Sequence, residues 1–163
     1  MAPFTEPASF PLLYRAFFLY IEPVATALGF VYAFFAPSLY LHMTMPSPIS
    51  LATGLLPEAT TLETIVLNQL GNMYLAFALN EAIVLRVTSD RKVWSAFLLG
   101  LLIADFGHLW SVHALGWQLY YRFWTWNSMH WGNLGFVYVG ATMRTAFLLG
   151  VGINTNQPKP KRG

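Results

Sequence analysis

The sequence predicts an all-α membrane protein, a polytopic four-helix bundle with an interfacial segment between its third and fourth helices. Of its 163 residues, 56% are hydrophobic and only 10% are charged, and the mean hydropathy is +0.49. A soluble domain has about 25% charged residues. Four stretches approach the length of about 20 apolar residues that a helix needs to cross a bilayer. Ionisable residues inside these stretches indicate an internal polar site.

The four predicted helices form a single membrane domain over residues 1–163. They cover residues 12–36, 63–87, 93–115 and 132–153 approximately. A basic tail follows at 154–163. The segment 37–61 is rich in Pro, Ser and Thr, which predicts a loop, and TSDRK at 88–92 predicts a tight turn.

The segment between the third and fourth helices, residues 116–131, holds four of the six tryptophans of the chain. Trp and Tyr concentrate where the bilayer meets water. We therefore expect this segment to lie along the membrane surface, in part as a short flat helix. An ordinary loop is the alternative interpretation.

The basic residues predict the orientation in the membrane. If the N-terminus is cytosolic, seven of the nine Lys and Arg residues fall on or near the cytosolic side, as the positive-inside rule requires. Arg122 alone falls on the far side, and Arg144 lies inside the fourth helix. Both termini are then cytosolic. The final residues, KPKRG, resemble a dilysine signal for retrieval to the endoplasmic reticulum, and a solvated basic tail is the alternative.

Several classes of function are excluded or disfavoured. The chain has no cysteine, which rules out disulfides, thiolate metal sites and thiol nucleophiles. A formal charge of +2, scattered along the chain, does not indicate a nucleic-acid partner. There is no nucleotide-binding fingerprint, so no organic cofactor is expected. Asp105 and His108 have the D-x-x-H spacing of two metal ligands, but with no histidine cluster we expect no metal site.

The strongest functional signal is a group of acids within the apolar stretches. An ionisable group near the bilayer centre costs about 2.5–3.5 kcal/mol, and Glu22, Glu81, Asp105 and Arg144 all lie in predicted spans. We expect them to point inward and to form one polar pocket. Asp105 and Glu81 are the candidate proton donor and acceptor, with Glu22 as an alternative acid. His108, one turn from Asp105, is expected to orient an acid or to relay a proton.

Ligand contacts are expected from a second group of residues. Arg144 would set the charge of one acid. The aromatic rings of Trp110 and Tyr138 could stabilise a cationic intermediate through their faces. The candidate substrate-binding residues are Arg144, Asn72, Asn80, Trp110 and Tyr138.

Each candidate residue also has a purely structural interpretation. Asp105 and His108 could hydrogen-bond each other. Glu22 could simply stand at a kink, because Pro23 leaves the carbonyl of Leu19 without its helical donor. The asparagines could join helices, and the Arg144 side chain could extend to the cytosolic interface.

Four blocks of the chain resemble a family of small fungal membrane proteins of unknown function. They are LYIEPV at 19–24, LNEAIVLR at 79–86, LLIADFGHLWS at 101–111 and WNSMHWGNLGFVYVGATMR at 126–144. The resemblance spans roughly residues 10–150. In shape the chain is also similar to the emopamil-binding-protein-like (EXPERA) proteins and to small membrane terpene cyclases, which is an analogy of fold alone.

These observations predict a membrane protein with a buried acidic pocket for a hydrophobic sterol, terpenoid or lipid ligand. The expected chemistry is acid–base isomerisation or cyclisation, so an enzyme of this kind would be an isomerase or a cyclase. The alternative is a lipid-binding, accessory or chaperone protein without chemistry. The expected partners are membrane lipid and a hydrophobic small molecule, and a homo-oligomer is left open.

Overall fold

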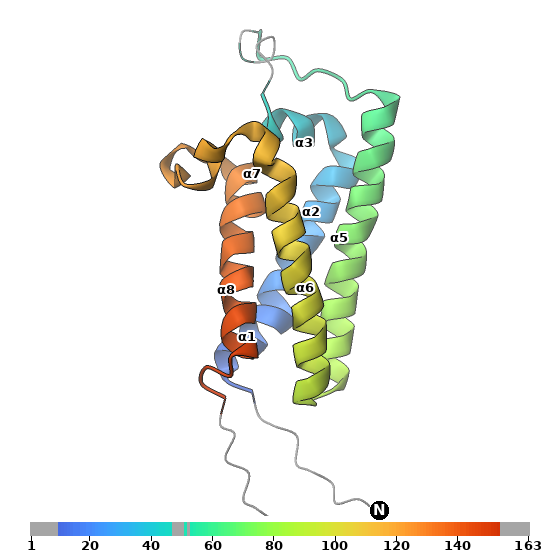
Figure 1. Ribbon diagram of the computed structural model, residues 1–163. Helices are drawn as coiled ribbons and strands as arrows, with labels where there is room; N and C mark the ends of the chain where they lie inside the picture. Colours follow the sequence, from blue (N-terminus) through green and yellow to red (C-terminus); the bar gives the residue numbers. More distant parts are fainter. Residues whose placement is uncertain (1–9, 47–50, 52, 154–163) are drawn as a thin grey trace, which may run out of the picture.

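The computed structural model describes residues 10–46, 51 and 53–153, and the all-α prediction is confirmed. Four long helical segments run side by side (Figure 1). They are Leu12–Phe35 (α1 Leu12–Ala16, η1 Phe17–Ile21 and α2 Glu22–Phe35), α5 Thr61–Val87, α6 Arg91–Ser111, and Ser128–Leu148 (α7 Ser128–His130, η5 Trp131–Gly135 and α8 Phe136–Leu148). α2 packs mainly on α5, and α6 packs on α8.

The first long segment changes its winding just before Pro23. Residues Phe17–Ile21 form a π-helical turn, after which α2 begins at Glu22. Proline cannot donate to the carbonyl of Leu19. Arg86 of α5 replaces that donor, because its Nη2 donates to the Leu19 carbonyl oxygen at 2.6 Å.

Side-chain caps define where α5 and α6 begin. Thr60 and Glu63 form a reciprocal capping box at the start of α5. Asp90 accepts a hydrogen bond from the backbone N–H of Lys92 at 2.7 Å at the start of α6. The turn between them, TSDRK, is therefore shorter than the sequence alone predicts, since α6 already begins at Arg91.

The prediction of a loop over 37–61 is wrong for its first residues. Its first residues form helix α3, Pro37–Thr44, which continues almost directly from α2. Pro37 occupies the first helical position, where its fixed φ suits a helix and its missing N–H costs nothing. Tyr40 of α3 is buried against Leu67 and Met129, so this helix closes one end of the bundle.

The predicted interfacial segment is a series of short 3₁₀ turns at the same end. Within it lie η3 Trp117–Tyr120 and η4 Phe123–Thr125; η2 Val112–Leu115 precedes it, so the third predicted helix ends as an α-helix at Ser111 rather than at Leu115. The Trp126 indole donates to the Leu119 carbonyl at 2.7 Å. The segment then enters the fourth helical segment at Ser128, four residues earlier than predicted, and that segment ends at Leu148 rather than 153 because Gly150 and Gly152 take positive φ angles.

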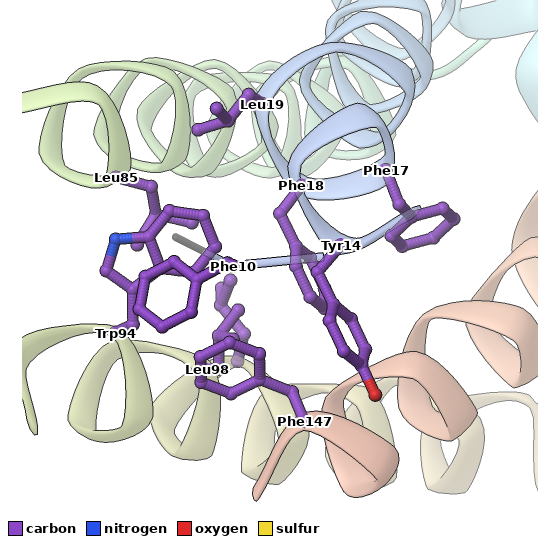
Figure 2. Packing of buried hydrophobic residues seen from close by; sticks show 10 residues of the cluster. Phe10, Tyr14, Phe17, Phe18, Leu19, Leu85, Trp94, Leu98 and Phe147 are labelled. Carbon is purple, nitrogen blue, oxygen red and sulfur yellow. The ribbon is translucent and has the colours of Figure 1, made fainter. Parts of the chain in front are cut away.

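The larger core lies at the opposite end of the bundle, where the described chain begins and ends. Phe10, Tyr14 and Phe18 pack against Trp94 of α6 and Phe147 of α8 (Figure 2). The Tyr14 hydroxyl donates to the Val151 carbonyl at 2.9 Å. The first and last described residues thus lie at one end of the molecule.

Two described helical segments have the length and apolar composition of a membrane span. They are Leu12–Phe35 and Arg91–Leu115. In the second segment, only 11% of an apolar stretch of 18 residues is buried inside the protein. α5 is long enough but carries four amide side chains, at Asn68, Gln69, Asn72 and Asn80. Four membrane spans were predicted, and two of the four long segments have the length and apolar composition of a span.

Candidate functional site

The central feature of the bundle is a cavity of about 420 Å³, which we call the acidic cavity. Its volume lies within the range of small-molecule pockets, roughly 300–1,000 Å³. The charged residues on its wall come from all four long helical segments: Glu22, Glu81, Asp105 and Arg144. The four charged groups therefore converge on one interior cavity, as predicted.

Arg144 holds two of the acids together. Its Nη1 donates to Asp105 Oδ2 at 2.5 Å, and its Nη2 donates to Glu22 Oε1. The side chains of Arg144 and Glu22 are 4% and 7% exposed, and that of Asp105 is 13% exposed. Buried charges persist only when paired, so this arginine bridge keeps two carboxylates inside the bundle. Asp105 therefore pairs with Arg144 and not with His108.

Glu81 is the third acid and has no such bridge. It is only 2% exposed on α5 and faces the Glu22 carboxyl. Its Oε1 is buried without a hydrogen-bond partner in the described part of the chain, as is Glu22 Oε2. Glu81 and Glu22 are adjacent carboxyl groups, and the one cation beside them, Arg144, is already shared by Glu22 and Asp105. This arrangement favours a neutral Glu81 that carries its proton.

His108 lies one helical turn from Asp105 on the same cavity wall. Its ring contacts the backbone of Asn133. Its Nε2 is buried and has no hydrogen-bond partner among the described residues. An imidazole with an unused ring nitrogen can accept or relay a proton, and this role of His108 stays a prediction.

A glycine on α8 makes the arginine bridge possible. A Cβ at Gly140 would lie 2.7 Å from Arg144 Nη1 and 3.5 Å from Glu22 Oε1. Gly140 is one turn before Arg144, so the guanidinium folds back over it toward Glu22. No sequence pattern singled out this glycine, because its importance depends on a neighbour from another helix.

Comparison with known proteins identifies a family but no function. Residues 7–154 match the family model described as Domain of unknown function (DUF7704). The chain belongs to the DUF7704 family. No curated protein and no solved structure matches it. The DUF7704 match covers the four blocks on which the sequence resemblance rests, and the likeness in shape to EXPERA proteins stays an expectation.

Four of the predicted ligand contacts of this DUF7704 chain do not line the acidic cavity. Asn72 and Asn80 are exposed on α5, and Asn80 donates to the Ala76 carbonyl of its own helix at 2.8 Å. Trp110 is 63% exposed and stacks on His113. The Tyr138 hydroxyl donates to the Tyr120 carbonyl at 3.1 Å. The sequence predicts roughly how far along a helix these four residues lie, but it does not predict which face of the helix points into the cavity.

Other aromatic residues line the cavity instead. They are Tyr32, Tyr40, Tyr74, Phe77, Trp131 and Phe136. Tyr74 lies seven residues before Glu81 on α5, so the two side chains share a helix face. In the described part of the chain, no group of three His, Asp or Glu side chains is arranged to hold a metal ion.

Proposed function

We propose that the protein is an integral membrane protein. Its helices carry large apolar side chains on their outer faces, among them Ile83, Ile103 and Phe106, each more than half exposed. A soluble protein seldom exposes so continuous an apolar surface. Lipid is the natural partner of that surface, and the single-domain arrangement follows from the shared interior.

We infer that both termini face the cytosol. The described chain begins and ends at one end of the bundle, and Arg15, Arg86, Arg91 and Lys92 belong to the helix ends there. The predicted aromatic segment and Arg122 lie at the other end. The KPKRG tail lies outside the described residues, so the assignment to the endoplasmic reticulum rests on its sequence.

We propose that the acidic cavity binds a hydrophobic sterol- or terpenoid-like alkene and catalyses an acid–base isomerisation or cyclisation. One observation carries the proposal: three carboxyl groups and one arginine line a single cavity, and the arginine bridges only two of them. Such an arrangement holds a proton donor and a proton acceptor together, which is how one site performs acid–base chemistry at neutral pH.

Each group would have a defined role. The Glu81 carboxylic acid donates its proton to an alkene carbon, and the π electron pair forms the new C–H bond and leaves a carbocation. Aromatic faces of Phe77, Trp131 and Phe136 would stabilise that cation. The Asp105 carboxylate then removes a proton from a neighbouring carbon, whose C–H electrons become the new double bond. His108 would return the proton to Glu81.

The experiment uses deuterium from water as a tracer. Membranes containing the protein are supplied with unsaturated sterols and prenyl alcohols in D₂O, and the lipids are analysed by mass spectrometry for deuterium that does not exchange back. We expect a labelled product with the natural chain and with Asp90→Asn, which replaces an exposed acid outside the cavity by a residue that also caps a helix. We expect none with Glu81→Gln. Binding of these lipids without deuterium incorporation would favour the non-enzymatic lipid-binding alternative.

A further inference from the structure

A second cavity of about 480 Å³ lies next to the acidic cavity, at the α3 end of the bundle, and we call it the α3 cavity. It is bounded by α3, the first half of α5, and the end of α6 with η2. The two cavities share four wall residues: Tyr40, Tyr74, His108 and Asn133. They are therefore neighbouring chambers along one path through the bundle.

The shared wall is thin. The hydroxyl groups of Tyr40 and Tyr74 lie 3.3 Å apart and form a hydrogen bond across it. Gly29 on α2 allows this approach, because a Cβ there would meet the Tyr74 ring at 3.3 Å. Two side chains joined by one hydrogen bond are a small barrier, so one elongated molecule can occupy both chambers after a rotation of either ring.

Two residues that line the α3 cavity each have a buried ring nitrogen without a partner. His42 Nδ1 and His108 Nε2 both have no hydrogen-bond partner in the described part of the chain, and both residues line this cavity. Buried polar groups are nearly always hydrogen-bonded, so such atoms indicate a missing partner. Much of the remaining wall is apolar, with Leu41, Leu70 and Val112 among its residues.

The charges around the α3 cavity select the kind of polar group that fits. Glu58 and Glu63 line it, and its described lining includes no Lys or Arg. An anionic head group would meet carboxylates with no compensating cation. The Glu63 carboxylate is already hydrogen-bonded by Thr60, through both its backbone N–H and its hydroxyl, at 2.8 Å. A neutral hydroxyl suits the two imidazoles best, because it can donate to one nitrogen and accept from the other.

We propose that the α3 cavity is the head-group site of an elongated, hydroxyl-bearing amphiphile whose hydrocarbon part passes the Tyr40–Tyr74 pair into the acidic cavity. This deepens the proposed function, since it names the substrate class of the same site. The hydroxyl would be bound by His42 and His108, and the apolar body would lie against Glu81.

Three photoreactive probes of equal chain length test this: a long-chain alcohol, the matching carboxylic acid and the matching amine, each with a diazirine beside its polar group. The full-length protein is labelled in phosphatidylcholine nanodiscs and the cross-linked peptides are mapped. We expect the alcohol to label residues of α3 and the first half of α5, and to do so more than the acid or the amine. Loss of one hydrogen bond in His42→Phe should reduce this labelling about fivefold.

His113→Phe is the matched control, because His113 lines neither cavity, and it should label like the natural chain. Equal labelling by the acid or the amine, or no effect of His42→Phe, would overturn the proposal. Glu81→Gln separates the two hypotheses. Alcohol labelling that persists in this variant supports the head-group site whatever becomes of turnover, and turnover without labelling at α3 overturns the head-group site alone.

Discussion

Arg86 donates a hydrogen bond to the carbonyl oxygen of Leu19 at 2.6 Å, and this is the carbonyl that Pro23 leaves without a helical donor. The contact joins α5 to the first helical segment one turn before Glu22. It fixes the part of the chain from which the first acid of the cavity projects. A charged donor and a backbone acceptor in apolar surroundings are worth more than an ordinary surface contact.

Arg86→Gln should therefore destabilise the fold by about 1–3 kcal/mol, measured by unfolding the purified protein in detergent with SDS. Pro23→Ala restores the backbone N–H at residue 23. The double variant should therefore recover most of the loss, although Pro23→Ala alone changes little. Additive effects in this double-mutant cycle would contradict the assignment of Arg86 as the replacement donor.

Gly140→Ala should weaken the arginine bridge. A Cβ 2.7 Å from Arg144 Nη1 must displace the guanidinium from Glu22 and Asp105. We expect a loss of about 1–3 kcal/mol of stability from overpacking. Gly107→Ala on α6 is the matched control, since a Cβ there has nothing within 4 Å. It should be neutral or slightly stabilising because alanine favours a helix, and equal behaviour of the two variants would argue against the close packing at Gly140.

Arg144→Met should leave two carboxylates buried beside Glu81 without a cation. Removing one partner of a buried ion pair costs about 3–5 kcal/mol, so the variant should lose its fold in detergent or accumulate poorly in membranes. Adding Glu22→Gln and Asp105→Asn removes the uncompensated charges and should restore much of the expression. Thermal stability of the triple variant no better than that of Arg144→Met would show that the arginine acts through packing instead.

The membrane assignment makes a prediction for the outer face of α6. Ile103 is 65% exposed, and a charged side chain in the centre of a span costs about 2.5–3.5 kcal/mol. Ile103→Lys should therefore reduce insertion, assayed as the fraction of protein that resists alkaline carbonate extraction. Trp124, 68% exposed in η4, provides the control, because Trp124→Lys at the bilayer surface should insert normally. Full insertion of both variants would contradict a lipid-facing Ile103.

Much of the architecture could be predicted from the sequence because it follows from hydropathy and local signals. Apolar stretches of span length predicted the four helical segments to within a few residues at most ends. The energetic cost of burying charge predicted that Glu22, Glu81, Asp105 and Arg144 would meet inside the bundle. α3 was missed because Pro and Ser suggested a loop, although Pro37 at a first helical position was a usable signal.

The rest of the site depends on helix rotation and on contacts between distant segments. Asn72 and Tyr138 have the residue types expected of a ligand site, but a change of rotation within one turn moves a side chain from the interior to the outside. Gly140 and His42 show the opposite case. Neither has a distinctive sequence context, and each acquires a role only from Arg144 beside it or from the cavity that α3 closes.

The central claim is that Glu81 carries a proton inside the cavity while Arg144 holds Glu22 and Asp105 as carboxylates. Infrared difference spectroscopy of the protein in lipid at neutral pH tests it most directly, because a protonated carboxyl has a C=O stretch distinct from that of a carboxylate. The account predicts a protonated-carboxyl band that shifts in D₂O, disappears in Glu81→Gln and persists in Asp90→Asn. A band that survives in Glu81→Gln, or no such band in the natural chain, would contradict it.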